Sequence, residues 1–285
     1  QTHHVSSAAS DVYKRQTPSY GKDIGEVLYA SKESANTAIN AASEAFKTWS
    51  KTGMSYRAEL ILKFRQGVID KSSEIVDICI KEAGKTKPDA EAELDRAIQA
   101  LTHASGIQHF YPAHISRNVA GNIDIADMRY PIGVVAGVGP FNFPILIPIL
   151  HSSMALVTGN THIAKPSEKV PSISRLYADI YKDVGLPDGC YNVINGGKDI
   201  VEYIVSHQKV DGLAFIGSTN AARSLKSLGV KNNTKVQALG GGKNHMIVLP
   251  DADLDMAADA AVSASFGAAG QRCMAVSVVV AVGDI

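Results

Sequence analysis

Apolar residues recur at helical spacing through the first part of the chain. They stand three or four residues apart at Ala38, Ala42, Ala45, Phe46 and Trp49, and in looser form at Leu60, Leu62, Phe64, Val68 and Ile69. This is the period of a helix with one buried face. Thr52-Gly53 and Gly84-Lys85 are typical turn residues between such pieces, and Pro88 suits the first turn of the piece that follows. The segment 34–110 is therefore predicted to form a layer of three helices.

From Asn118 the pattern changes to short apolar runs that alternate with helical stretches. The runs predict strands at 133–138, 161–164, 191–194, 212–216, 236–239 and 246–249. Helices are predicted around 146–158, 172–184, 198–206 and 219–228. Such alternation is typical of an α/β fold, a Rossmann-like parallel sheet with helices on both faces. Ligands of these sheets bind at the carboxyl ends of the strands, here the loops 139–144, 165–169, 217–220 and 240–244.

The two ends of the chain differ from this pattern. Residues 1–16, QTHHVSSAASDVYKRQ, have no apolar core and no period, so we expect neither a secretory signal nor a regular element there. We interpret them as a non-native scar. The run 278–285 is typical of a strand but has no following element to pair with, as if the sequence were cut short. A domain boundary is expected at 238–245, where three glycines leave the predicted sheet.

Composition narrows the class of partner. Of the 285 residues, 45% are hydrophobic, which is enough for a sizeable core and excludes a disordered chain. Lys plus Arg (28) balance Asp plus Glu (28), so small molecules are expected rather than nucleic acid or a membrane surface. No charged residue lies between Arg129 and Lys165, but four prolines interrupt that stretch. Buried strand, turn and helix therefore fit better than a membrane span.

The three cysteines are too scattered for a disulfide framework or a zinc site, so no metal is expected. Their use indicates a reducing compartment, such as cytoplasm or the mitochondrial matrix. Cys273 lies in the run GQRCMA, directly after Arg272. A thiol beside a cation can have a lowered pKa and act as a nucleophile, although most lone cysteines are buried and inert.

Two loops carry groups suited to a nucleotide, each with an alternative. Gly217 and Ser218 end a predicted strand where a helix begins, and the free N–H groups of a helix start can bind phosphate. The alternative is an ordinary serine cap. Lys165 and Glu168 leave a buried strand together, so they can bind ribose hydroxyls or, alternatively, open and cap a solvated helix.

Taken together, the motifs resemble those of the NAD(P)-dependent aldehyde dehydrogenases. PFNFP (140–144), KPSE (165–168), FIGS (215–218), GGKN (241–244) and GQRC (270–273) stand in that family's order. The resemblance covers residues 17–285 and implies the aldehyde dehydrogenase fold, truncated at the start of the catalytic domain. It implies an NAD-binding domain at 17–238 with part of an oligomerisation hairpin, and an incomplete catalytic domain at 239–285. A homo-oligomer, dimer or tetramer, is implied for the full-length protein.

The resemblance also implies roles for single residues. Cys273 would be the nucleophile, and Asn142 would donate to the oxyanion together with the Cys273 backbone N–H. The positions that match those contacting the dinucleotide are Gly139, Phe141, Lys165, Glu168, Lys169, Gly217, Ser218 and Gly240.

One position departs from the hydrolytic members of the family, which carry a glutamate where this chain has Leu239. Leucine cannot activate water, so the acyl acceptor is expected to be a thiol, coenzyme A. GQRCMA also resembles the acylating branch, the methylmalonate-semialdehyde dehydrogenases, in which Arg272 and Arg96 would hold the substrate carboxylate. For Arg96 the alternative is a surface partner of Glu93.

The implied reaction oxidises methylmalonate or malonate semialdehyde to propionyl-CoA or acetyl-CoA with NAD and coenzyme A. Two alternatives stay open: an aldehyde dehydrogenase with another substrate or acceptor, and a nucleotide-binding fragment without turnover.

Overall fold

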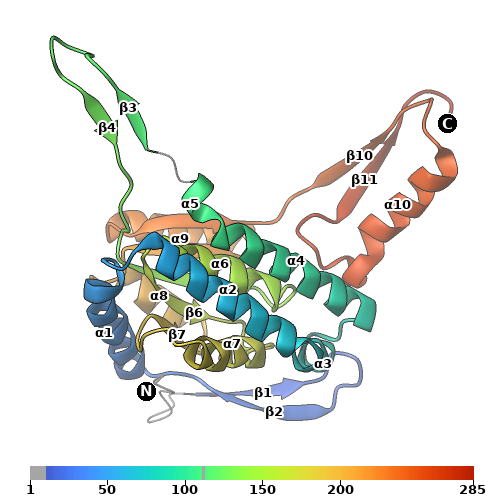
Figure 1. The fold of residues 1–285 in the computed structure, drawn as a ribbon. Helices are drawn as coiled ribbons and strands as arrows, with labels where there is room; N and C mark the ends of the chain where they lie inside the picture. The colour runs from blue at the N-terminus through green and yellow to red at the C-terminus, as the bar shows by residue number, and fades with distance from the viewer. Residues whose placement is uncertain (1–10, 111–112) are drawn as a thin grey trace.

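A parallel five-stranded sheet forms the centre of the computed structural model, which describes residues 11–110 and 113–285 (Figure 1). Its strands are β5 (Val134–Val138), β6 (Thr161–Lys165), β7 (Tyr191–Val193), β8 (Gly212–Ile216) and β9 (Lys235–Leu239). They lie in the order β7-β6-β5-β8-β9, and every neighbouring pair is parallel. The predicted fold class is thus confirmed. Five of the six predicted strands form this sheet and lie within one residue of the observed bounds. The sixth, predicted at 246–249, is β10 (Asn244–Val248), which belongs to a separate sheet.

Helices cover both faces of the sheet. On one face lie α6 (Leu146–Val157) and α7 (Ser172–Asp183), with α2 (Met54–Asp70), α3 (Ser72–Ala83) and α4 (Lys87–Ser105) packed behind them. On the other face lie α1 (Lys32–Trp49), α8 (Lys198–Ser206) and α9 (Thr219–Lys231). Phe64 of α2 is fully buried, and its ring stacks on Tyr181 with the ring centres 3.6 Å apart. The hydrophobic core between α2 and α7 therefore joins the outer helices to the helices that cover the sheet.

The helices of 34–110 differ from the predicted single layer in two ways. α1 lies on the opposite face of the sheet from α2, α3 and α4, and the chain has one more break than predicted. The chain turns between α2 and α3 at Lys71, which has φ −98° and ψ 12° and serves both helix ends. A short helix, α5 (Ile107–Phe110), follows α4. No glycine or proline marks position 71, so the prediction of a single helix between Gly53 and Gly84 was wrong.

The expectation of no regular element in residues 1–16 is wrong from Val12 onward. β1 (Val12–Gln16) pairs antiparallel with β2 (Asp23–Leu28). Arg15 of β1 pairs with buried Glu82 at the end of α3. The strand VYKRQ is held by its pairing with β2 and by this charged contact, and it lacks the alternation of apolar residues from which a strand is predicted. Residues 1–10 of the predicted scar lie outside the described residues.

Two extensions project from the sheet and its helices. One is the hairpin of β3 (His114–Ser116) and β4 (Ile125–Asp127). The other, which we call the arm, contains β10 (Asn244–Val248), α10 (Leu254–Phe266), the 3₁₀ turn η1 (Gly267–Gly270) and β11 (Val276–Ala281). The strand predicted at 278–285 begins earlier and pairs with β10, an element before it. The arm strands form a separate sheet after β9, and the proposed domain division at 238–239 stays a prediction.

The uncharged stretch between Arg129 and Lys165 folds as β5, α6 and β6, in which most side chains are buried in protein. No helix among the described residues has the length and apolar content needed to cross a membrane.

Candidate active site

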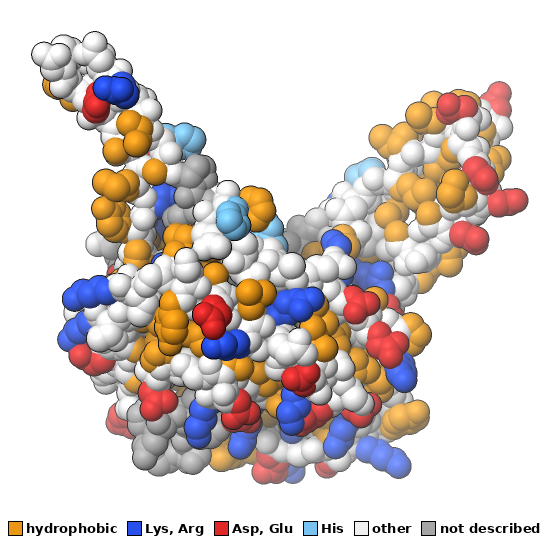
Figure 2. Space-filling model, viewed as in Figure 1, with side chains coloured by type: hydrophobic (Ala, Val, Ile, Leu, Met, Phe, Trp, Pro, Cys, Tyr) orange, Lys and Arg blue, Asp and Glu red, His pale blue; other side chains and the backbone are white. Residues whose placement is uncertain are grey.

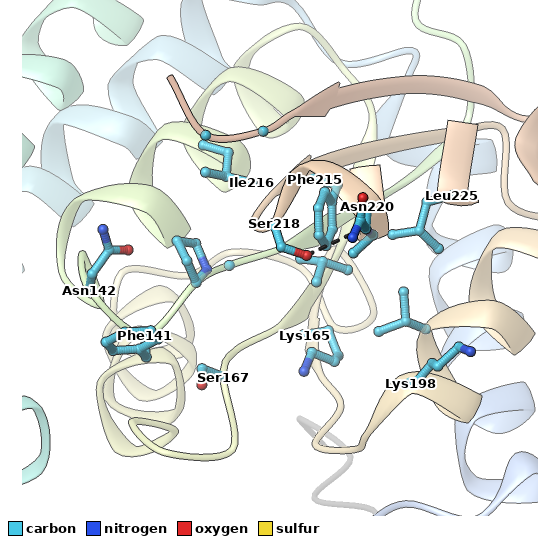
Figure 3. Close-up of a pocket in the computed structure, with 18 of the residues that line it drawn as sticks. Phe141, Asn142, Lys165, Ser167, Lys198, Phe215, Ile216, Ser218, Asn220 and Leu225 are labelled. Atoms are coloured by element: carbon cyan, nitrogen blue, oxygen red, sulfur yellow. Dashed lines mark hydrogen bonds between the residues drawn. The ribbon is translucent and has the colours of Figure 1, made fainter. Parts of the chain in front are cut away.

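A cavity of about 830 Å³ opens at the carboxyl ends of β5, β6 and β8 (Figure 3). The strand order reverses between β5 and β8, which is the point where open parallel sheets bind ligands. The volume lies within the range of about 300–1,000 Å³ that is usual for small-molecule sites. The lining includes ten of the predicted positions: Gly139, Phe141, Asn142, Lys165, Glu168, Gly217, Ser218, Gly240, Arg272 and Cys273. The structure thus brings together residues from the arm and from the five-stranded sheet with its helices, which we call the body.

Lys165 and Glu168 form a charged pair in the cavity wall. Lys165 is 5% exposed, its Nζ donates to Gly196 O at 3.0 Å, and it lies 3.6 Å from Glu168 Oε2. Burial lowers the pKa of Lys165, and the carboxylate of Glu168 opposes that shift. Ser167 rather than Glu168 accepts from a following backbone amide, that of Lys169, at 3.3 Å. The pair therefore faces the cavity, as a ribose-binding pair requires.

Lys169 lies beside this cavity, not in its lining. Its Nζ sits 4.8 Å from the centre of the Phe141 ring, an amino–aromatic contact that packs against a cavity residue.

The loop at Gly217 and Ser218 caps a helix and also borders the cavity. Ser218 caps α9, and its Oγ accepts from Ala221 N at 3.3 Å. The start of α9 also borders the cavity, so the positive end of the helix faces it. At Gly240, a Cβ would lie 2.8 Å from Thr219 Oγ1, so the backbone passes the helix start more closely than another residue would allow. The arrangement suits an anion that contacts backbone amides.

Asn142 and the Cys273 loop are in direct contact. Asn142 Nδ2 donates to Gln271 O at 2.7 Å, which leaves its second N–H for another acceptor. Cys273 is exposed, whereas Cys79 and Cys190 are buried. Burial raises the pKa of both other thiols to about 12, so they stay protonated at neutral pH. Among the three cysteines, only Cys273 has the access that a nucleophile needs.

Two further contacts to this loop were not predicted. Asn244 Nδ2 donates to Cys273 O at 2.9 Å and to Ala275 O at 3.0 Å. Asp89 Oδ1 accepts from Arg272 Nη2 at 2.6 Å. Asn244 belongs to a motif visible in the sequence, but nothing local to Asp89 signals a partner 183 residues away.

The two arginines predicted to hold a carboxylate are placed differently. Arg272 lines the cavity, and one of its nitrogens is used by Asp89. Arg96 is exposed on α4, lies outside the lining, and donates to Gln99 Oε1 at 2.8 Å. Glu93, its alternative partner, instead binds Lys85 and the start of α6.

Leu239 ends β9, where its carbonyl accepts from Gly217 N at 3.1 Å and its side chain is half exposed. The described lining residues contain two carboxylates, Glu168 and Glu202, and Glu168 is paired with Lys165. Within the described part of the chain, no group of three or more His, Cys, Asp and Glu side chains is placed to hold a metal ion.

Comparisons with known proteins agree with this fold. A model of the aldehyde dehydrogenase family matches residues 4–285. Malonate-semialdehyde dehydrogenases of Bacillus pumilus and Pseudomonas aeruginosa are 40% and 41% identical, over 92% and 97% of this chain and 54% and 55% of their own. The structure of methylmalonate-semialdehyde dehydrogenase from Oceanimonas doudoroffii superposes with a TM-score of 0.94 at 39% identity, covering 97% of this chain and 57% of that one.

A Sinorhizobium meliloti structure complexed with NAD has a TM-score of 0.95 at 37% identity, over 99% of this chain and 58% of that one. The chain spans about half the length of the curated relatives it matches. Because the family match covers nearly all 285 residues and includes the cavity and the Cys273 loop, the chain belongs to the aldehyde dehydrogenase family.

Proposed function

We propose that this chain carries the NAD site and the nucleophile of a coenzyme A-acylating dehydrogenase for malonate and methylmalonate semialdehyde. The observation that carries the proposal is the position of exposed Cys273 at the cavity, in a loop bound by Asn142, with a leucine at position 239. The names of the relatives support the substrate class.

The cavity fits a dinucleotide in its donors and its shape. Lys165 and Glu168 offer a cation and a carboxylate to ribose hydroxyls, and the start of α9 offers amides to a pyrophosphate. A side chain at Gly217 or Gly240 would collide with Phe215 or Thr219, so glycine lets the backbone pass close to the start of α9. NAD, when bound, supplies the acceptor for a hydride.

The chain's own residues carry the first chemical step. The Cys273 thiolate attacks the aldehyde carbon, a C–S bond forms, and the carbonyl oxygen becomes an oxyanion. The free N–H of Asn142 Nδ2 and the Cys273 backbone N–H stabilise that charge, each by about 3–4 kcal/mol. Loss of hydride from the same carbon leaves a thioester on Cys273.

Release of the acyl group follows from the residue at position 239. Leu239 has no group that takes a proton from water, so the thioester persists until a thiol arrives. The coenzyme A thiolate attacks the thioester carbonyl and displaces the Cys273 thiolate. The substrate carboxylate leaves as CO₂, which water converts to bicarbonate, and the resulting thioester enolate takes a proton from water. The product is propionyl-CoA or acetyl-CoA.

Arg272 is the first candidate to hold the substrate carboxylate. A guanidinium has five N–H donors, and the Asp89 contact uses a single nitrogen, so a carboxylate can still bind in a bidentate manner. Arg96 is a second candidate whose side chain lies outside the cavity lining in this structure. Of these two arginines, Arg272 lines the cavity and Arg96 does not.

We also propose that the protein acts as a homo-oligomer, a dimer or tetramer. The β3–β4 hairpin projects from the molecule and exposes Ile115 and Ile125, which are 68% and 55% exposed (Figure 1). An exposed apolar hairpin of this kind is suited to a protein interface.

A burst experiment tests the acyl acceptor. The chain is extended by the remaining half of a relative, mixed with aldehyde and NAD, and followed by NADH absorbance. Without coenzyme A we expect a burst of about one NADH per active site and then a slow rate, because deacylation is blocked. Coenzyme A should restore fast turnover and give acyl-CoA. Fast turnover to the free acid without coenzyme A would contradict the acylating assignment.

Two other functions are each distinguished from this one by a test. A dehydrogenase with another aldehyde or acceptor would show higher kcat/KM for an aldehyde that lacks the carboxylate. A nucleotide-binding chain without turnover is favoured by its covering about half the length of its relatives. In that case the 285-residue chain binds NADH but forms no NADH from aldehyde, whereas the extended chain forms NADH from aldehyde.

A further inference from the structure

Two carboxylates on α4 lie one helical turn apart and contact two different loops of the site. Asp89 and Glu93 are separated by four residues, so they share a face of the helix. Asp89 contacts the loop that carries Cys273, and Glu93 contacts the chain that follows Asn142. Neither carboxylate lines the cavity.

The Arg272 side chain is fixed on two sides. Its Nη2 donates to Asp89 Oδ1 at 2.6 Å, with both side chains about three-quarters buried. Its guanidinium lies against the backbone of Gly267, where an added Cβ would come within 2.7 Å of the guanidinium carbon. Because Arg272 precedes Cys273, holding this side chain restricts the backbone of the nucleophile.

Glu93 holds the second loop. The side chain is almost fully buried, and its Oε1 accepts from Ile145 N and Leu146 N, both at 2.8 Å. Its Oε2 accepts from Lys85 Nζ at 2.5 Å, and this ammonium lies 4.5 Å from the centre of the Phe143 ring. These contacts fix the start of α6 directly after Asn142 and Phe143.

The two loops meet where Asn142 Nδ2 donates to Gln271 O. From this geometry we propose that Asp89 is a positioning residue: acting through Arg272, it holds the Cys273 loop in register with the Asn142 loop that Glu93 anchors. The inference deepens the proposed function and rests on it. Its physical basis is that a nucleophile displaced by about 1 Å can lose on the order of a hundredfold in rate.

The main test is Asp89→Asn in the extended chain, assayed with malonate semialdehyde and with propanal. We expect kcat to fall about ten- to a hundredfold for both substrates, with KM for NAD unchanged. Asp89→Glu, which keeps the carboxylate, should recover much of the activity. A loss confined to KM for the semialdehyde would overturn the proposal, because Asp89 would then only orient a carboxylate-binding arginine.

Two control variants separate this role from others on the same helix. Glu91→Gln removes an exposed charge, whose partner Lys87 is 3.7 Å away, and should change nothing. Thr86→Ala removes the cap of α4, since Thr86 Oγ1 bonds both the backbone and the side chain of Asp89. If Thr86→Ala reduced kcat as much as Asp89→Asn does, the cap would be the cause and the proposal would fail.

A second variant reaches the same contact from the other side. Gly267 has φ −54° and ψ 136°, which alanine adopts freely, so Gly267→Ala acts by displacing the guanidinium and not by strain. We expect a loss similar to that of Asp89→Asn, and no further loss in the double variant. Additive losses would show two independent effects.

Hydrogen exchange of the 285-residue chain tests the positioning without any turnover. Peptides covering 267–275 should exchange faster in Asp89→Asn than in Glu91→Gln, while peptides of β5 and β6 stay unchanged. Equal exchange in the two variants would overturn the proposal even if the enzyme assignment holds. Faster exchange with no aldehyde oxidation by the extended parent chain would instead refute the proposed function.

Discussion

The body of the molecule, the five-stranded sheet with its helices, and the arm are built from similarly apolar sequences but differ in burial. Every residue of β6 is buried, whereas α10 has no buried residue and β11, VSVVVA, has none either. Figure 2 shows apolar side chains gathered on the arm, while charged ones are mixed over the body. Leu254, Met256, Val262 and Phe266 of α10 are more than half exposed. Apolar residues in a helix or strand are therefore buried only where a second layer packs against that element.

The two regions also divide the proposed chemistry. The nucleotide groups Lys165, Glu168 and Ser218 come from the body, and Cys273 comes from the arm. If this division holds, binding and covalent chemistry can be changed separately.

The largest expected effect is that of Cys273→Ala on catalysis. The variant of the extended chain should lose aldehyde-dependent NADH formation by at least about a thousandfold, because the sulfur is the proposed attacking atom. Binding of NADH, followed by its fluorescence, should stay within about twofold, since the proposed nucleotide contacts lie elsewhere. Cys79→Ala offers a matched thiol control in the body. Aldehyde-dependent NADH formation that persists in Cys273→Ala would remove the nucleophile assignment.

Next in size is the difference between two phenylalanines on helices. Phe64→Ala in the body should reduce the free energy of unfolding by about 3–5 kcal/mol, because the fully buried ring stacks on Tyr181. Phe266→Ala in the arm, where the ring is 73% exposed, should change it by less than about 0.5 kcal/mol. Urea titration of both variants of the 285-residue chain measures this. Equal losses would mean that the arm ring is buried in solution.

The same contrast explains what the sequence could and could not predict. Strands β5 to β9 follow from local apolar runs, and their ends place Lys165 and Ser218 at the cavity. The contact between Asp89 and Arg272 joins residues far apart in the chain, and no local pattern encodes it. Arg15 of β1 likewise has its charged partner, Glu82, far along the chain, and no local residue type marks the break at Lys71. The role proposed for Asn142 comes from the resemblance to the family, because its local sequence alone does not indicate one.

Acid should destabilise the body through two histidines. Burial lowers the pKa of His162 to about 3 and that of His151 to about 4. Both side chains therefore resist protonation in the folded protein. Both folded-state values lie below the unfolded value of about 6.5, so stability present above that pH is lost as the pH falls toward them. At pH 5 each histidine costs about 2 kcal/mol, because the unfolded chain binds a proton and the folded chain does not.

The variant His162→Leu tests whether stability falls with pH because of this histidine. Both ring nitrogens of His162 lack a hydrogen-bond partner among the described residues, so an apolar side chain sacrifices no described bond there. Between pH 7 and pH 5 the variant should lose about 2 kcal/mol less stability than the parent, measured by urea titration. His109→Gln, at an exposed position, serves as the control. A parent curve that is flat over this interval would contradict the prediction.

A smaller and more selective effect is expected for Arg272→Leu, which removes an arm residue that faces the cavity. It should reduce kcat/KM for malonate semialdehyde at least about tenfold more than for propanal, because a bidentate contact to the carboxylate is lost. Some loss with propanal is also expected, since Arg272 is the group through which Asp89 acts. Equal losses for the two aldehydes would leave Arg272 with the positioning role alone.

The smallest effect is expected for Arg96→Leu, although the resemblance gives Arg96 the same role as Arg272. Its exposed guanidinium donates to Gln99 on its own helix and lies outside the cavity lining, so its removal breaks a surface contact of small energy. We expect kcat/KM to change by less than about twofold for either aldehyde. Gln99→Ala removes the same surface contact and leaves the arginine, so it is the matched control. A loss of tenfold or more that is specific to the semialdehyde would mean that Arg96 turns toward the substrate, and that the helical layer of the body shares in carboxylate binding with the arm.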